Sequence, residues 1–261
     1  FLELLDRDTA VNNLSVFLQL LGNLDEKALI QSANQIIARH EILRTSFAFD
    51  MGLPAAEIAQ EISLSISVHD LQRFHGKAGE IEALSLAEKE VLKPFDLRQA
   101  PLIRIELYKL DTEKYFLLFI AHHTVADGWS LGVFLRELML FYENNAMGKN
   151  SQISGLPIQY FDYAHWQSDD KQHEKLKDSL SYWKEKLNGD LPVLELPTDK
   201  KRGTRQSFNG GTHRFELSKD LTDKLEMLSR QEDVTMYMTL LTTFYIVLHR
   251  YSQQNEILIG S

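Results

Sequence analysis

Apolar residues recur with two different periods along this chain. Short apolar-rich runs, typical of strands, occupy residues 13–21, 43–49, 102–110 and 115–121. Apolar residues at helical spacing predict helices over residues 25–40, 80–92, 129–145, 157–167 and 174–187. The side chains expected to face inward from the first helix are Ala28, Leu29, Ala33, Ile36 and Ile37. This mixture of strands and helices predicts an α+β fold.

The segment with the most chemistry lies between the run 115–121 and the helix 129–145, where residues 121–130 read AHHTVADGWS. His122, His123 and Asp127 thus lie where a buried strand ends, and ionisable groups there are costly to desolvate unless paired. Because imidazole titrates near neutral pH, His123 is a candidate general base. Asp127 fits two roles, orienting an imidazole or pairing with a buried arginine, and the spacing leaves both open.

The residues that follow suit a loop that approaches a ligand. Gly128 permits a close backbone approach or a positive φ. Trp129 and Ser130 begin the next helix, whose N-terminus favours developing negative charge. A plainer interpretation is a pair of satisfied core histidines, with Asp127 capping that helix. A metal site is disfavoured, because the sequence has no cysteine and offers no third histidine or second carboxylate at helical spacing.

Composition narrows the functional class. With 44% hydrophobic and 25% charged residues, the chain resembles a soluble globular enzyme, and the absence of cysteine suits a cytoplasmic protein. No apolar run is long enough to span a bilayer and no secretory signal is visible, so no membrane partner is expected. The net charge of -9 argues against a nucleic-acid partner, and the cluster at Lys200, Lys201 and Arg202 is too short to reverse it.

Three motifs give a family resemblance. Residues 122–128, HHTVADG, resemble the HHxxxDG signature of the condensation domains of non-ribosomal peptide synthetases, which belong to the chloramphenicol-acetyltransferase-like superfamily. Residues 39–47, RHEILRTSF, are similar to the family's RHExLRTxF signature, and residues 160–167, YFDYAHWQ, to its YxDYAxWQ signature. Residues 94–97, PFDL, are a further, weaker match. The order and separations agree with the family, and the likeness covers almost the whole chain.

The resemblance implies a fold and a domain division. We expect a chloramphenicol-acetyltransferase-like two-layer lobe, a mixed sheet flanked by helices, over residues 1–200. A linker is expected at about 189–211, where breakers are frequent and apolar repeats are few. Residues 212–261 are then the beginning of a second, similar lobe, with an opening strand, helices and a next strand. By this interpretation the sequence is a truncated fragment, which could be inactive alone.

The resemblance also implies a reaction. The amine of an acceptor aminoacyl thioester attacks the thioester carbonyl of a donor, forming an amide (peptide) bond. Both substrates are carried on phosphopantetheine arms of donor and acceptor peptidyl carrier protein domains, next to an adenylation domain, and the domain itself binds no cofactor or metal. His123 either acts as the base or positions the amine, with His122, Asp127 and Gly128 completing the catalytic motif. Trp129 and Ser130 are expected to contact substrate.

Other residues are expected to support the site. Arg39 or Arg44 would point inward and pair with an acidic group, for which Asp127 is one candidate; an arginine beyond residue 261 is the alternative partner for Asp127. Tyr160, Tyr163 and Trp166 have the spacing of a helix that packs aromatic residues into a core.

Three competing functions remain. One is a related member of the superfamily, a coenzyme-A-dependent or polyketide-associated acyltransferase that makes esters or amides. The second is a glycerolipid acyltransferase, because His122 and Asp127 also satisfy a bare HxxxxD pattern. The third is a condensation-like docking module without catalysis.

Overall fold

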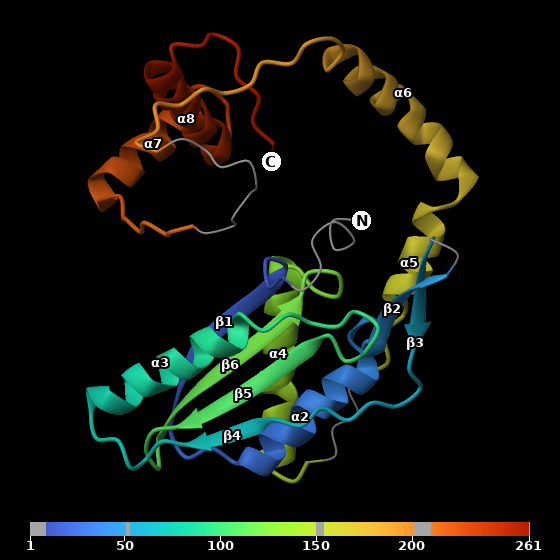
Figure 1. Cartoon of the computed structure of the whole chain (residues 1–261), viewed down its shortest axis with the longest axis vertical. Coiled ribbons are helices and arrows are strands. Elements are labelled where there is room, and N and C mark those ends of the chain that lie inside the picture. The colour runs from blue at the N-terminus through green and yellow to red at the C-terminus, as the bar shows by residue number, and fades with distance from the viewer. Residues whose placement is uncertain (1–8, 51–52, 150–153, 201–209, 261) are drawn as a thin grey trace. The chain divides into compact units, whose positions relative to one another are not determined.

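The computed structural model describes residues 9–50, 53–149, 154–200 and 210–260 (Figure 1). The chain divides into two compact units, Phe1–His173 and Glu174–Ser261. Of the residues considered above, Lys201, Arg202 and the rest of residues 201–209 in the expected linker lie outside the described part. The division into lobes at about residue 200 stays a prediction.

A four-stranded mixed sheet forms the centre of the first unit (Figure 1). Its strands, in spatial order, are β1 (Asn13–Leu21), β6 (Lys114–His122), β5 (Ile103–Lys109) and β4 (Ser67–Asp70). The pairs of β1 with β6 and of β6 with β5 are antiparallel, whereas β4 runs parallel to β5. The strand β6, which delivers the histidine motif, is therefore paired on both sides.

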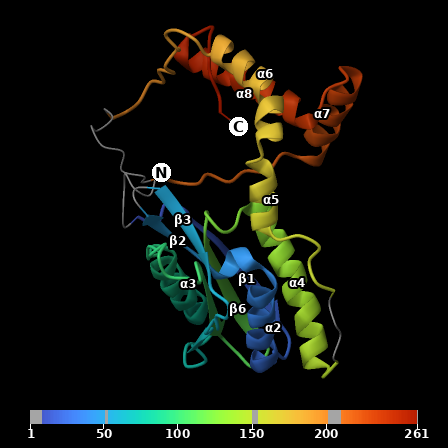
Figure 2. The ribbon, with the colours of Figure 1, turned by 90° about the vertical axis from the view of Figure 1, so that its right-hand side faces the viewer.

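Helices cover both faces of this sheet, as Figure 2 shows. On one face α2 (Glu26–Arg39) and α4 (Gly128–Ala146) bury an apolar cluster against alternate residues of β5 and β6. On the other face α3 (Lys77–Val91) covers a smaller cluster through Ala83 and Ala87. The α+β prediction, a mixed sheet flanked by helices, is confirmed.

The local sequence accounts for α2. The Asp25 carboxylate caps its N-terminus by accepting a hydrogen bond of 3.0 Å from the backbone N–H of Ala28. All the residues predicted to face inward are at most 4% exposed, so the helical period predicted the buried face as well as the helix.

Two short strands and one turn were not predicted. Glu41–Arg44 forms a 3-10 turn, so the strand predicted at 43–49 begins instead at Thr45, as β2 (Thr45–Asp50). It pairs with β3 (Leu53–Ile58) in a separate two-stranded sheet. Neither β3 nor β4 shows a clear period in the sequence, because each is short and is stabilised mainly by its partner strand.

The helix α5 (Tyr160–Gln167) differs from its prediction in two ways. It begins three residues later than predicted, where the Asp162 carboxylate accepts a 2.7 Å hydrogen bond from the Gln159 backbone N–H. Its aromatic residues are exposed rather than in a core: Tyr160 by 54%, Tyr163 by 44% and Trp166 by 53%. They pack against one another, with ring centroids of Tyr163 and Trp166 5.6 Å apart, so the prediction that they fill a core is wrong for the described residues.

The helices of the C-terminal part are α6 (Asp170–Lys186), α7 (Lys219–Gln231) and α8 (Met236–Ser252). The first begins four residues before the predicted segment. The strands expected at either end of residues 212–261 are not formed in the part that the structure describes, 210–260, because no segment there supplies a ladder partner. No helix in the described ranges has the length and apolar character needed to cross a bilayer.

Candidate active site

The histidine motif is held by its backbone at the end of β6. The N–H of His122 donates to the Leu102 carbonyl at 2.9 Å, and the N–H of His123 donates to the Asn12 carbonyl at 2.8 Å. These bonds tie the two residues to the segments leading into β5 and β1. The loop after His123 then turns into α4, so the motif lies between a buried strand and a helix N-terminus, as predicted.

His122 is buried and hydrogen-bonded, with 2% of its surface exposed. Its Nδ1 lies 2.9 Å from the Thr124 hydroxyl and accepts from the Thr124 backbone N–H at 3.3 Å. Because Nδ1 accepts, the neutral ring carries its proton on Nε2. His122 thus fits the interpretation as a satisfied core histidine, with a defined tautomer.

Phe95 is a neighbour of His122 that sequence reasoning missed. The two rings meet edge to face, with centroids 6.2 Å apart and planes at 79°. Phe95 follows α3 and belongs to the PFDL segment noted only as a secondary motif. That match was the available signal, but it does not indicate a contact with residue 122.

His123 contrasts with its neighbour, because its side chain is exposed. No side chain in the described ranges hydrogen-bonds to its imidazole. An accessible imidazole that no described side chain engages can accept a proton from a ligand or hydrogen-bond to it, which both a general base and a positioning group require.

Asp127 caps α4. Its Oδ1 accepts from the Ser130 backbone N–H at 2.8 Å and from the Ser130 hydroxyl at 2.6 Å. The Ser130 hydroxyl bond, followed by the Ser130 backbone bond, lowers the pKa of the Asp127 carboxyl. This is the capping role that the sequence left open, and it fixes the first turn of α4 directly after the histidines.

Neither predicted arginine is paired with Asp127. Arg39 Nε lies 3.1 Å from Glu137 Oε1, and its Nη1 donates to the Ser154 carbonyl at 2.6 Å. The reason is helical length: the ten residues from Asp127 to Glu137 span about 15 Å. The end of α2 therefore reaches the middle of α4 rather than its N-terminus.

Arg44 is occupied elsewhere as well. It donates to the Ala59 carbonyl beyond the end of β3, and its Nη2 lies 3.5 Å from Glu41 Oε1. The pairing of Arg44 with Asp127 is likewise corrected, because Arg44 lies where the 3-10 turn leads into β2.

The RHE motif supports α4 in another way. Glu137 Oε2 lies 2.6 Å from His40 Nε2, so one carboxylate joins Arg39 and His40 to the middle of α4. The Gln159 amide, just before α5, donates to the Arg39 carbonyl at 2.9 Å. The RHE motif therefore contacts the middle of α4 through Glu137, and the residue before α5 contacts the RHE motif through Arg39.

The remaining site residues lie at the start of α4. Gly128 is its first residue and has no positive φ, and a Cβ there would meet no atom within 4 Å. Of the two roles offered for Gly128, the positive φ is excluded, and the close approach to a ligand stays a prediction. The Trp129 side chain is 83% exposed. Trp129 and Ser130 line a largely apolar pocket of about 140 Å³, together with Phe119 and Ile36. Their contact with substrate stays a prediction.

The described residues contain no group of three or more His, Asp or Glu side chains arranged to hold a metal ion.

Comparisons with known proteins bear on this geometry. A family model described as the condensation domain matches residues 1–261. Linear gramicidin synthase subunits D and B of Brevibacillus parabrevis are 39% and 40% identical to the whole of this chain, which covers 5% of each. Surfactin synthase subunit 2 of Bacillus subtilis (strain 168) is 38% identical over 98% of this chain and 7% of its own length. The chain thus spans a small part of these curated relatives.

Solved structures support the same fold. The X-domain in its complex with OxyB from teicoplanin biosynthesis has a TM-score of 0.78 and 27% identity, over 92% of this chain and 52% of that one. The four-domain nonribosomal peptide synthetase AB3403, bound to AMP and glycine, has a TM-score of 0.80 over 97% of this chain and 19% of that one, at 23% identity.

Proposed function

The chain belongs to the condensation-domain family, and we propose that it forms an amide bond between two carrier-bound substrates in non-ribosomal peptide synthesis. Relatives that match it over nearly its whole length are subunits of linear gramicidin synthase and surfactin synthase. The observation that carries the proposal is the exposed imidazole of His123, which no side chain of the described ranges engages, next to a buried His122 whose tautomer is defined.

The proposed reaction is acyl transfer to an amine. The acceptor amine attacks the donor thioester carbonyl, a C–N bond forms, the C–S bond breaks, and the donor carrier leaves as its phosphopantetheine thiol. His123 either takes the amine proton or holds the amine by a hydrogen bond. Because a thioester is already reactive, holding amine and carbonyl in attack geometry supplies much of the acceleration.

The partners belong to the proposal as well. We propose that one peptidyl carrier domain holds the donor and a second holds the acceptor, and that an adenylation domain is adjacent in the same synthetase. The substrates' phosphopantetheine arms are supplied by the carriers, and the domain needs no bound cofactor of its own. A cytoplasmic location stays a prediction.

The test is transfer between two loaded carrier proteins, catalysed by the full protein that contains this chain and read by intact-protein mass spectrometry. We expect a dipeptidyl acceptor with the native protein and loss of at least about a hundredfold in rate for His123→Ala. The matched control is His75→Ala, which removes another exposed histidine, before α3. Equal rates for His123→Ala and the native protein would refute the role of His123.

One alternative has a specific observation in its favour. The teicoplanin X-domain, similar to this chain at 27% identity, was solved in a complex with OxyB. If the native protein makes no product with any loaded pair but binds a carrier or an enzyme, the chain is a docking module. Product from free amines or coenzyme A thioesters would instead indicate a related acyltransferase.

A further inference from the structure

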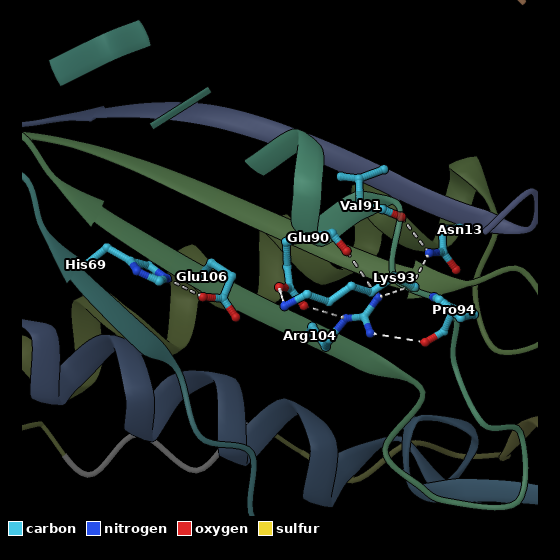
Figure 3. A network of polar contacts seen from close by, with 8 residues as sticks. All are labelled: Asn13, His69, Glu90, Val91, Lys93, Pro94, Arg104 and Glu106. Atoms are coloured by element: carbon cyan, nitrogen blue, oxygen red, sulfur yellow. Dashed lines mark hydrogen bonds and ion pairs between the residues drawn. The ribbon is translucent and has the colours of Figure 1, made fainter. Parts of the chain in front are cut away.

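A polar network lies on the α3 face of the sheet (Figure 3), and one of its members, Asn13, is opposite His122 in the register of β1 and β6. Arg104 on β5 makes most of the network's contacts, and Asn13 at the start of β1 contributes others. Both side chains reach the turn that follows α3. The strand between β1 and β5 is β6, which ends at His122, so the network borders that residue's strand on both sides.

Arg104 donates hydrogen bonds to backbone carbonyls at the end of α3 and in the turn that follows it. Nη2 donates to the Lys93 carbonyl at 2.6 Å and to the Glu90 carbonyl at 3.4 Å, and Nη1 donates to the Pro94 carbonyl at 3.4 Å. Its Nε lies 3.3 Å from the Glu90 carboxylate. A cation is favoured there, because the last carbonyls of a helix carry partial negative charge.

Burial of this guanidinium has a cost. Desolvation lowers the pKa of Arg104, while the nearby carboxylates of Glu90 and Glu106 act in the opposite direction. Arginine stays charged in proteins, so the free energy lost on desolvation is offset by hydrogen bonds and ion pairs rather than by loss of the proton.

Phe95 connects that turn to the active site. The Arg104 Cζ lies 4.0 Å from the centroid of the Phe95 ring, and the same ring meets His122 edge to face at 6.2 Å. A planar guanidinium stacks on an aromatic face, which an ammonium group or an alkyl chain does less well. Arg104, Phe95 and His122 thus form a continuous row of contacts.

We propose that Arg104 is a positioning residue for the reaction at the histidine motif, acting through Phe95, which it holds against the His122 ring. This inference rests on the proposed function for its kinetic part only. His122 in turn accepts from Thr124, directly after His123, so its placement sets the geometry of the loop that presents His123. Arg104 itself does not touch the reacting atoms.

The chain offers two matched controls. Asn13 donates to the carbonyls of Val91 at 2.7 Å and Lys93 at 2.9 Å, so it holds the same turn by hydrogen bonds alone. Arg73 lies 4.9 Å over Phe74 before α3, which is a second stacked pair on the same face but at the other end of the helix.

The first test is histidine footprinting with diethyl pyrocarbonate on the full protein, resolved to single residues by mass spectrometry. The reagent acylates an unprotonated imidazole nitrogen. In the native protein His123 is labelled, while His122 is protected by burial and by the Thr124 bonds to its Nδ1. We expect Arg104→Met and Phe95→Leu each to raise the labelling of His122 about fivefold. This is the change in an equilibrium that corresponds to the net contribution of one hydrogen bond.

The same experiment separates positioning from general loosening. His69 and His40 should keep their native labelling in Arg104→Met, and Asn13→Ala and Arg73→Met should leave His122 protected. Arg104→Lys should be more stable than Arg104→Met, because its ammonium group still reaches a carbonyl. It should not restore the protection of His122. Unchanged His122 labelling in folded Arg104→Met or Arg104→Lys overturns the proposal, as does an equal increase in Asn13→Ala.

The second test is kinetic. Arg104→Met should lower the kcat of carrier-to-carrier transfer about tenfold, with the KM for the acceptor within about twofold, because the loss is of alignment rather than binding. The double variant of Arg104→Met and Phe95→Leu should lose no more than the worse single variant. If the native protein transfers nothing, the proposed function fails, while the footprinting still decides whether Arg104 positions His122.

Discussion

The two faces of the central sheet are built differently. The face under α2 and α4 carries the larger apolar cluster, and its polar contacts, such as Asn145 with Ser32, join the two helices. The α3 face combines a smaller apolar cluster with Asn13, Arg104, Glu106 and the buried His122. Burial of apolar side chains stabilises the fold but does not fix the orientation of any one group. Hydrogen bonds and stacked rings do constrain the orientation of the side chains that make them. The α3 face therefore constrains the orientation of His122, whereas the other face contributes mainly buried apolar surface.

Leu117 and Leu118 provide the largest contrast between the faces. They are adjacent in β6, are 2% and 1% exposed, and belong to the α2/α4 cluster and the α3 cluster respectively. We expect Leu117→Ala to lower the free energy of unfolding by about 4 kcal/mol and Leu118→Ala by about 2.5 kcal/mol, because a single helix relaxes into a cavity more readily than two.

Urea denaturation of the full chain measures both leucine variants. An equal or larger loss for Leu118→Ala would show that the α3 face is as rigidly packed as the other.

The two histidines sharpen the contrast at the end of β6. His122→Ala removes a buried, hydrogen-bonded ring and should cost about 2 kcal/mol of stability, whereas His123→Ala should change it by less than about 0.5 kcal/mol. Thermal unfolding of both variants checks this. Similar losses would mean that His123 also has a structural role.

Glu137 tests whether a polar link on the apolar side matters. Glu137→Gln weakens the bonds to Arg39 and His40 and should cost about 1.5 kcal/mol. Glu143→Gln, an exposed position on the same helix, is the control and should be neutral. Chemical denaturation of the two variants measures the difference in stability. Equal midpoints would show that the Glu137 contacts do not stabilise α4.

The smallest effect is expected from Asp127. Its pKa is lowered in the folded state, so its charge contributes stability that is present above its unfolded pKa of about 3.9 and is lost as the pH falls through the folded pKa. Asp127→Asn keeps the cap but not the charge. The native protein should lose a few tenths of a kcal/mol relative to this variant between about pH 5 and pH 2, because an exposed carboxylate is screened.

Denaturation midpoints across that pH range measure the effect of Asp127. Parallel curves for the two proteins would show that the Ser130 bonds do not depend on the charge.

Several features of the fold were accessible from the sequence. The inward face of α2, the strand β1 and the placement of the histidine loop between strand and helix follow from local period and capping, which depend on residues close in the chain. The motifs likewise predicted the family. In contrast, β3 and β4 were missed, since short strands depend on partners that are distant or weakly patterned in the sequence.

The sequence by itself determined the elements that carry the site and the residues that form it, and it offered the local capping role of Asp127. Only the tertiary structure decided the partners that are distant in the chain: Arg39 with Glu137, and Phe95 between Arg104 and His122. The physical reason is that periodicity is a local property, whereas the partner of a charge or a ring depends on which distant segments pack together. The exposed His123 and the buried His122 are adjacent in the chain and become different only once β6 lies in its sheet.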